Sequence, residues 1–388
     1  MENKDFIQAH LHDDVNRLLL QASRYPDIDM PFVAEQILAR RQIKEKLPSW
    51  YANPEIIFPS RIAAEQCSSE LSAAYKQRLI KGERVCDLTG GLGIDCWYFS
   101  QKASEVIYTE RFQEYCAAAA NNFSVLGATN IRISNEDSRT TAETLKTDTF
   151  YIDPARRSGS NKRLFALSDC EPDISQLKPL LLDNSQRIIV KISPMADSTE
   201  TLRLLPETKE IHIVAVKNEC KELLFVLEPE RKTEAVKLFA INYDTDNREQ
   251  SFEFTLEEEK SNEIQYVKSL GAYLYEPNAA ILKGGAFKTT GIRYGISKLH
   301  RHSHLYTSEL PVCDFPGRAF RILEIHEFSG KSLKHLGKLF PQANITTRNF
   351  PLKVEELRKM SGIRDGGEFY MFATTLANEQ KVMIICKK

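Results

Sequence analysis

The chain has 388 residues, and its 52 Lys plus Arg against 53 Asp plus Glu give a formal net charge of -1. At about 150 residues per domain this length predicts two or three domains. The near-neutral total excludes a uniformly polybasic nucleic-acid coat and an acidic disordered tail. No apolar run approaches the roughly 18 residues of a membrane span or forms a signal peptide, so we expect a cytoplasmic protein without membrane contact. The eight cysteines are scattered without a CxxC pair, which predicts reduced core residues rather than a disulfide framework or a zinc site.

Residues 1–80 are predicted to form a helical N-terminal arm. Apolar residues recur three and four positions apart without β-like alternation. Pro26, Pro31 and Pro48 divide the arm into short helices. A longer helix is predicted over 61–80.

Residues 81–230 alternate between strands and helices. The sequence predicts strands at 85–88, 105–109, 131–134, 149–152 and 187–192, a helix at 113–126, and a closing β pair at 211–216 and 222–227. This rhythm predicts an α/β fold with a doubly wound, Rossmann-like sheet, whose antiparallel edge is the closing pair.

The remaining chain segregates its charges. Residues 244–263 hold eight acids against two bases and predict a solvated hairpin, whereas residues 277–308 hold no acid. Residues 315–388 carry 13 bases against 7 acids, and their β-α-β-α-β-β pattern predicts a compact α+β domain. We therefore expect a small domain at 231–314 and a C-terminal one at 315–388.

A glycine-rich turn follows the first strand of the central domain, in the sequence VCDLTGGLGID at 85–95. A strand with an acid near its end, Asp87, enters a turn with Gly90, Gly91 and Gly93, where a Cβ would keep a ligand from approaching the backbone. Glu110 ends the next strand, where an acid can take two ribose hydroxyls. A dinucleotide-binding fold accounts for these residues as well.

Two further acids follow the third and fourth strands. Asp137 lies where an adenine amino group could be met, and the sequence TFYIDPAR at 149–156 places Asp153 and Pro154 directly after a strand. This order of motifs resembles the class I S-adenosylmethionine-dependent methyltransferases over about 81–230. The resemblance implies a cofactor site, with the methionine end at the glycine turn, the ribose at Glu110 and the adenine at Asp137. The cofactor-binding residues expected on this basis are Asp87, Gly90, Gly91, Gly93, Glu110 and Asp137.

The resemblance also implies the reaction, because an Asp-Pro-Pro-aromatic signature after the fourth strand marks amino-group methylation. Asp153 is expected to accept a hydrogen bond from the amine, with help from the Pro154 carbonyl, so that the amine is aligned with the methyl group. Two positions depart from the signature: Ala155 replaces the second proline, and Arg156 stands where a stacking aromatic is usual. The motif is also similar to Asp-Pro-Pro-Arg of uridine-5-methyltransferases. The fifth strand, however, continues as KISP at 191–194 without their cysteine nucleophile, so transfer to carbon is not expected.

Cations crowd the segment after this motif. Arg156, Arg157, Lys162 and Arg163 suit an anionic substrate such as RNA, although a solvated loop accounts for them too. Lys191, at the end of the fifth strand, either faces the site or lies on the surface. We name Arg156, Arg157 and Lys191 as expected substrate-binding residues.

Three histidines alternate in the basic segment. On a strand, His300, His302 and His304 would share one face and could hold a metal, but no acid or cysteine lies nearby, and no metal is expected. Tyr294 and Tyr306 could stack on bases or simply be core residues.

The C-terminal runs TRNFP at 347–351 and GGEFYMFAT at 366–374 resemble a THUMP-like domain, a type of domain found beside RNA-modifying enzymes. Together the chain is similar to a bacterial group with a helical arm, a class I methyltransferase, a small ferredoxin-like insert and a THUMP-like tail. The resemblance implies the reaction class more directly than the substrate. We predict a methyltransferase acting on a base nitrogen of RNA (tRNA or rRNA). The alternatives are a protein or small-molecule methyltransferase, and a catalytically idle RNA-binding protein.

Overall fold

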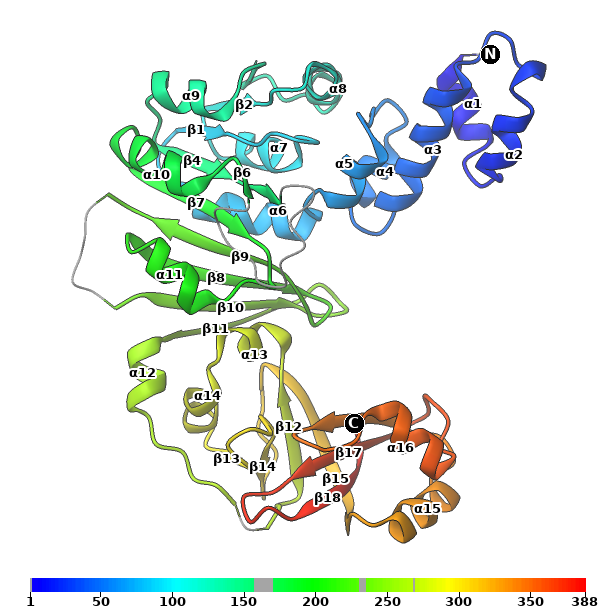
Figure 1. Cartoon of the computed structure of the whole chain (residues 1–388), viewed down its shortest axis with the longest axis vertical. Coiled ribbons are helices and arrows are strands. Elements are labelled where there is room, and N and C mark those ends of the chain that lie inside the picture. The colour runs from blue at the N-terminus through cyan, green and yellow to red at the C-terminus, as the bar shows by residue number, and fades with distance from the viewer. Residues whose placement is uncertain (1, 157–169, 230–234, 268) are drawn as a thin grey trace. The chain divides into compact units, whose positions relative to one another are not determined.

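A computed structural model describes residues 2–156, 170–229, 235–267 and 269–388. The chain forms two compact units (Figure 1). Unit 1 holds Met1–Ile211 and Glu222–Glu234, and unit 2 holds His212–Lys221 and Ala235–Lys388. In the described ranges, no helix combines the length and the apolar character needed to cross a membrane.

Unit 1 begins with the predicted arm of short helices. Acidic side chains start two of them: Asp14 accepts from the backbone N of Asn16, and Asp29 accepts from that of Phe32. The helices are α1 (Asn3–Ala9), α2 (Val15–Leu20), α3 (Met30–Ile43), α4 (Pro48–Ala52), α5 (Arg61–Gln66) and α6 (Glu70–Lys76). The prediction of one helix over 61–80 is wrong. The backbone is extended at Cys67, and the Ser69 side chain caps a new helix by accepting from the Ser72 N.

The sheet of unit 1 runs in the order β9-β7-β4-β1-β2-β3. All neighbours are parallel except β9, which is antiparallel to β7. The strands are β1 (Arg84–Asp87), β2 (Glu105–Thr109), β3 (Ile131–Ser134), β4 (Thr149–Ile152), β7 (Arg187–Ile192) and β9 (Glu219–Leu227). Strand β4 is buried at every position, as expected for a parallel strand covered on both faces. The predicted doubly wound sheet is therefore confirmed.

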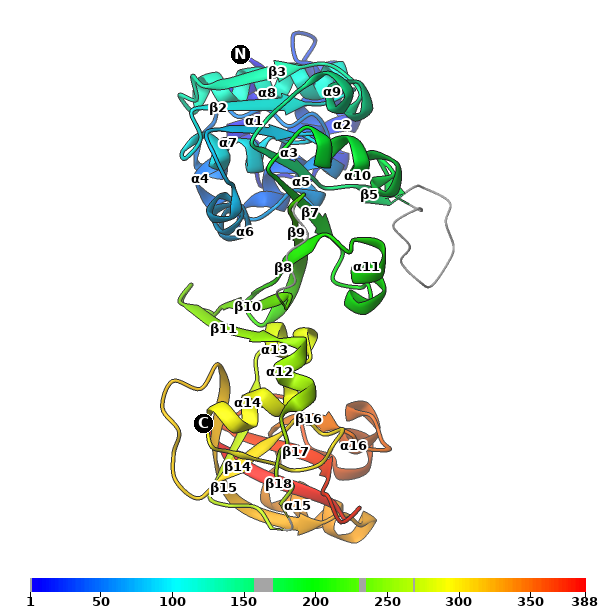
Figure 2. The ribbon, with the colours of Figure 1, turned by 90° about the vertical axis from the view of Figure 1, so that its left-hand side faces the viewer.

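Helices cover both faces of this sheet. They are α7 (Ile94–Ser100), α8 (Gln113–Val125), α9 (Ser138–Thr144), α10 (Ile174–Asp183) and α11 (Ser198–Leu204). Helices α6 and α7 pack against each other, as do α9 and α10. Figure 2 shows the two pairs on opposite faces.

The hairpin of β8 (Thr208–Val216) and β9 is shared between the two units. Lys217 and Asn218 join the strands with φ of 51° and 62°, the left-handed values of a tight hairpin turn. The chain thus enters unit 2 at His212 and returns to unit 1 at Glu222. The predicted β pair at 211–216 and 222–227 lies in this hairpin. The prediction that the pair forms the edge of the sheet is wrong, because β8 is followed in the strand order by β10 (Lys237–Tyr243).

Unit 2 continues with the hairpin of β10 (Lys237–Tyr243) and β11 (Glu249–Thr255). The acidic segment 244–263 contributes only the second strand of this hairpin, because the first strand ends at Tyr243. After the second strand, the Thr255 side chain caps helix α12 (Leu256–Ser261). The other elements of unit 2 are β12 (Tyr273–Pro277), α13 (Ala279–Gly284), α14 (Phe287–Arg293), β13 (Ser297–Lys298), β14 (Tyr306–Ser308), β15 (Gly317–Glu327), α15 (Gly330–Leu339), β16 (Asn344–Arg348), α16 (Val354–Ser361), β17 (Phe369–Thr375) and β18 (Lys381–Lys387). From β15 onward the observed order is the predicted β-α-β-α-β-β.

A second sheet forms the centre of unit 2, in the order β13-β14-β12-β15-β18-β17-β16. Along β18, Met383 and Ile385 join the core under α15 and α16, whereas Ile384 and Cys386 join a second core with Phe320. Because side chains alternate along a strand, this sheet is buried on both faces.

The three alternating histidines do not lie on a strand. Residues 299–305 form a turn in which His304 adopts a left-handed φ of 48°. His300 bonds to Asn349 at 2.9 Å, while the His304 ring stacks on Phe287 with a centroid distance of 3.6 Å. The expectation of a shared face is therefore wrong. No cluster able to hold a metal ion occurs among the residues with a described placement. Tyr306 is a buried core residue, which agrees with the second of the two roles predicted for it, stacking on a base or packing in the core.

Candidate active site at the carboxyl ends of the parallel strands

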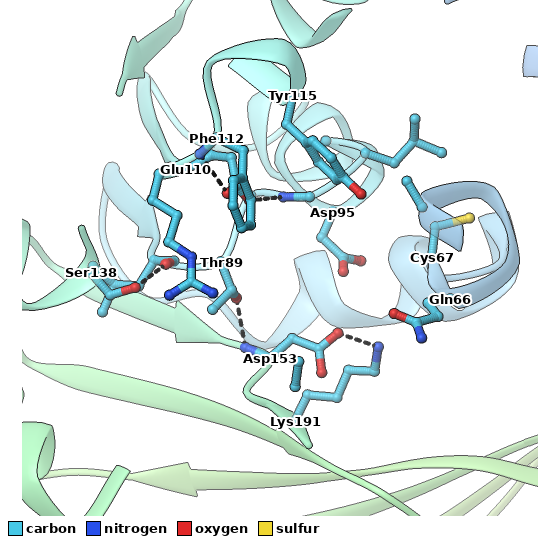
Figure 3. Close-up of a pocket in the computed structure, with 18 of the residues that line it drawn as sticks. Gln66, Cys67, Thr89, Asp95, Glu110, Phe112, Tyr115, Ser138, Asp153 and Lys191 are labelled. Carbon is cyan, nitrogen blue, oxygen red and sulfur yellow. Dashed lines mark hydrogen bonds and ion pairs between the residues drawn. The ribbon is translucent and has the colours of Figure 1, made fainter. Parts of the chain in front are cut away.

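A cavity of about 700 Å³ lies in unit 1 beside the ends of β1 and β4, where the strand order reverses direction. Open parallel sheets bind ligands at this point, because the loops on either side diverge and leave a crevice. The volume lies within the usual range for small-molecule sites, about 300–1,000 Å³. Ten of the residues that line the cavity are labelled in Figure 3. The lining includes Gln66, Cys67, Thr89, Gly90, Gly91, Gly93, Asp95, Glu110, Phe112, Tyr115, Asp137, Ser138, Asp153 and Lys191.

The three glycines of the turn are required for different reasons. A Cβ at Gly90 would lie 2.3 Å from the Tyr108 ring. Gly93 has a φ of +87°, and its Cβ would lie 2.7 Å from Phe123. At Gly91, with a φ of +53°, the nearest atom to a Cβ is the Thr89 carbonyl oxygen at 3.7 Å. Internal packing thus demands glycine at 90 and 93, and backbone conformation favours it at 91.

Asp87 lies beneath the turn and does not line the cavity. Its Oδ1 accepts from the Thr89 backbone N at 2.9 Å, and its Oδ2 accepts from the Cys96 thiol at 3.4 Å. These two bonds give Asp87 a role in shaping the turn, and its contact with the cofactor stays a prediction. Burial, reinforced by the nearby Asp95, raises the pKa of Asp87 to about 7.

This raised pKa predicts a pH-dependent stability difference between the wild type and Asp87→Asn. The pKa of this carboxyl is near its ordinary value of about 3.9 in the unfolded chain and about 7 in the folded one, so between these two pH values the folded state binds the extra proton. The wild type should lose stability relative to the variant as pH rises through this window, by up to about 1.4 kcal/mol per pH unit. Urea unfolding at several pH values measures the difference. A difference that stays constant from pH 4 to pH 8 would contradict the shift.

Glu110 and Asp137 both face the cavity from strand ends. Glu110 follows β2, and its two carboxylate oxygens accept from the backbone N of Gly91 at 3.2 Å and of Phe112 at 3.1 Å. Asp137 follows β3 and caps α9 by accepting from the Arg139 N at 2.9 Å. The structure thus brings the glycine turn, Glu110 and Asp137 together around one cavity.

Asp153 lies directly after β4 and is held from two sides (Figure 3). Its backbone N donates to the Thr89 Oγ1 at 2.8 Å, and its Oδ2 accepts from the Lys191 Nζ at 2.6 Å. Lys191 therefore faces the site rather than the surface. The Asp153 Oδ1 makes no hydrogen bond to any residue that the structure describes.

The residues after Asp153 form a short strand pair. Pro154 is buried, and β5 (Ala155–Arg156) pairs antiparallel with β6 (Cys170–Glu171), which places the Arg156 backbone opposite Cys170. Arg157, Lys162 and Arg163 fall outside the described residues, so their predicted contacts with a substrate remain predictions.

Sequence reasoning missed part of the cavity wall and the charges behind it. Gln66 and Cys67, from the break between α5 and α6, line the cavity with the aromatic side chains of Phe112 and Tyr115. Behind this wall, Lys76 forms ion pairs with Asp95 at 2.9 Å and with Glu222 at 3.1 Å. Gln66 and Cys67 lie within the helix predicted over 61–80, and their residue types alone indicate no contact with a ligand.

The strand order, with β9 inserted antiparallel beside β7, and a cavity at the glycine turn define a class I methyltransferase. Comparison with known proteins agrees. Residues 273–316 match a model of a ferredoxin-like domain, and residues 317–388 match a THUMP domain-like model. An uncharacterized S-adenosylmethionine-dependent methyltransferase of Mycobacterium tuberculosis is 24% identical over 346 residues, which cover 86% of this chain and 89% of the relative.

A crystal structure of a proposed methyltransferase from Porphyromonas gingivalis W83 is 40% identical, with a TM-score of 0.90. It matches 100% of this chain and 97% of the other. The chain belongs to this family of class I S-adenosylmethionine-dependent methyltransferases with a C-terminal THUMP-like domain. The fold and reaction class predicted from the sequence are thereby confirmed.

Proposed function

We propose that this methyltransferase modifies a base nitrogen of RNA, in tRNA or rRNA, by direct in-line transfer. The observation that carries the proposal is the placement of Asp153 at the cavity, with one carboxylate oxygen bound by Lys191 and the other without a partner among the described residues. A carboxylate oxygen in this position can accept a hydrogen bond from the amine that receives the methyl group.

The cavity fits the cofactor. S-adenosylmethionine supplies a methyl group already activated by its sulfonium. Gly90, Gly91 and Gly93 offer backbone groups to the methionine end, and Glu110 offers carboxylate oxygens to the ribose, since each retains acceptor capacity beyond its one backbone bond. Asp137 faces the same cavity and suits the adenine amino group.

The residues of this chain then need only bind and orient the acceptor. Asp153 would hold the amine by a hydrogen bond, and the Pro154 carbonyl would help to turn its lone pair toward the methyl group. No protein nucleophile is required, which agrees with the absence of a cysteine from the segment 191–194.

The case for RNA rests on unit 2 and on the loop after the motif. The THUMP domain-like match covers 317–388, within a region where bases exceed acids by 13 to 7. Arg156 and Arg157 follow Asp153 at three and four positions and would hold phosphates of the substrate.

Incubation with labelled S-adenosylmethionine and total RNA, followed by nucleoside analysis, tests the substrate. A methylated base in RNA supports the proposal. Label recovered only in protein or in small molecules points to the corresponding alternative enzyme. RNA binding that weakens with salt, without any transfer, points to an idle RNA-binding protein.

The ribose role of Glu110 predicts a clear binding phenotype. Glu110→Ala removes the acceptor for two hydroxyls, and a hydrogen bond to a charged group is worth about 1.5–3 kcal/mol. S-adenosylhomocysteine should therefore bind at least about tenfold more weakly, as measured by calorimetric titration. Glu114→Ala, an acid in the first turn of α8 that does not line the cavity, is the matched control. Equal affinities for the two variants would remove Glu110 from the cofactor site.

A further inference from the structure

Five charged side chains form a continuous chain at the cavity wall: Asp153, Lys191 and Asp95 line the cavity, and Glu222 and Lys76 are buried behind them. Their successive nitrogen–oxygen distances are 2.6 Å for Asp153–Lys191, 3.9 Å for Lys191–Glu222, 3.1 Å for Glu222–Lys76 and 2.9 Å for Lys76–Asp95. The residues come from the loop after β4, from β7, from β9, from α6 and from α7. All five belong to unit 1. Negative and positive charges alternate along the chain, so each cation lies between two anions.

Strand register explains why Lys191 and Glu222 face each other. Lys191 of β7 is registered opposite Leu224 of β9, and opposite residues of an antiparallel pair point to the same face. Glu222 lies two residues from Leu224 and therefore on that face too. It is a diagonal neighbour of Lys191, within reach of long side chains.

Burial makes this arrangement rigid. Lys76 is 0% exposed and Glu222 is 2% exposed, and Lys76 also donates to the Ser68 hydroxyl and contacts Asp95. A buried ion cannot exchange its partner for water at low cost, so Glu222 stays where Lys76 holds it. On the other side, Glu222 is the second anion within 4 Å of the Lys191 ammonium.

We infer that Glu222 is a positioning residue. Anchored by Lys76, it holds the Lys191 ammonium against one oxygen of Asp153, so that the other oxygen is presented to the acceptor nitrogen. The inference rests on the proposed role of Asp153 as the group that orients the acceptor. It changes the expected role of Lys191 from a substrate contact to a partner of Asp153.

This arrangement also indicates the charge of the acceptor. Because Lys191 already compensates the Asp153 carboxylate, the pair offers little net attraction to a cation. A protonated protein amine would meet a second ammonium beside the carboxylate. An uncharged nitrogen, such as an exocyclic amine of a base, meets only a hydrogen-bond acceptor.

Glu222→Gln tests the inference, with Glu228→Gln as the matched control. Glu228 follows the same strand but pairs with Arg187 and Lys81, away from the cavity. The readout is the rate at which Lys191 is acylated by acetic anhydride, followed by mass spectrometry, because only the neutral amine reacts. Desolvation alone would lower the pKa of Lys191, but Asp153, Glu222 and Asp95 raise it. Lys191 also interacts electrostatically with the Cys67 thiol.

We expect the Glu222→Gln change to increase the acylation of Lys191 by about tenfold or more, which corresponds to one pKa unit, and the Glu228→Gln change to leave it unaltered. Unaltered acylation of Lys191 in folded Glu222→Gln overturns the inference. If Glu222→Gln does not fold, Glu222→Asp keeps the charge at a greater distance and should give a smaller increase; no increase overturns the inference as well.

Methyl transfer provides the second readout. If Glu222 acts through Lys191, the double variant Glu222→Gln/Lys191→Met should lose no more turnover than Lys191→Met alone, with the KM for the cofactor unchanged. Additive losses contradict the inference. The two proposals can fail separately. If the wild type methylates no RNA, but Lys191 is still acylated faster in Glu222→Gln than in the wild type, the proposed substrate is overturned and the assignment of Glu222 is supported.

Discussion

Replacing Asp153 by Ala should reduce methyl transfer by at least about 100-fold while the affinity for S-adenosylhomocysteine stays close to that of the wild type. The carboxylate lies at the end of β4, and its Oδ2 is bound to Lys191 at 2.6 Å. Without it the acceptor loses the hydrogen bond that aligns it, and misalignment of about 1 Å costs about 100-fold in rate. Single-turnover transfer and calorimetric titration measure the two quantities separately.

Two further variants make this result specific. Asp153→Asn keeps an acceptor oxygen and should retain more activity than Asp153→Ala if the group orients the amine. Asp183→Ala, at the exposed end of α10, should leave both quantities unchanged. Equal losses in Asp153→Asn and Asp153→Ala would show that the negative charge is required rather than the acceptor oxygen.

Replacing Lys76 by Met should lower the unfolding free energy of unit 1 by about 3–5 kcal/mol. Lys76 is fully buried between Asp95 and Glu222, and removing one partner of a buried ion pair leaves the other charge uncompensated. The two tryptophans of the chain, Trp50 and Trp97, lie in unit 1 with ring centroids 6.4 Å apart. Tryptophan fluorescence during urea unfolding therefore reports on this unit.

Lys81→Met is the matched control for this prediction. Lys81 pairs with Glu228 at 3.3 Å, but its side chain is 45% exposed, and such a pair is worth about 0–1 kcal/mol. Similar losses of unfolding free energy in Lys76→Met and Lys81→Met would show that the buried ion pairs stabilise unit 1 no more than the exposed one.

The pH dependence of the Lys76→Met effect has a defined sign. Burial raises the pKa of Asp95, but Lys76 and Lys191 outweigh it and leave the pKa below its usual value. A lowered pKa adds stability above the unfolded pKa, and this stability is lost on acidification. In the variant Asp95 loses the Lys76 charge that lowers its pKa, so it protonates at a higher pH. The difference in unfolding free energy between Lys76→Met and the wild type should therefore become smaller as the pH falls toward about 4.

The parts of the site that follow strand ends could be predicted from the sequence. Glu110 and Asp153 each come directly after an apolar run, and the carboxyl ends of parallel strands meet at one edge of the sheet. For that reason local patterns sufficed to bring the glycine turn, Glu110, Asp137 and Asp153 together.

The chain of charges at the cavity wall and behind it could not be predicted in this way. Lys76, Asp95 and Glu222 are separated by 19 and 127 positions, and their meeting depends on how α6 packs on α7 and how β9 is inserted beside β7. Each residue type by itself is typical of an exposed helix or strand. Tertiary packing brings the three residues together, and no spacing rule in the sequence predicts that packing.

Two predictions based on regular sequence patterns were wrong because of the local backbone conformation. The apolar spacing of 61–80 continues across Cys67, but the Ser69 cap starts a new helix there. The alternating histidines fit a strand, yet Lys298 donates to the carbonyl oxygens of His300 and Arg301 and so stabilises a turn. In both cases side-chain bonds to the backbone outweighed periodicity.

The shared β8–β9 hairpin means that the catalytic part of the protein cannot be isolated by a single cut. A chain ended after residue 234 would keep residues 212–221, which belong to unit 2, while losing the rest of that unit. His212, Ile213 and Val214 are buried in the full chain and would lose part of their surroundings. A soluble catalytic fragment would therefore need a short turn in place of 212–221, joined so that Glu222 keeps its register beside β7.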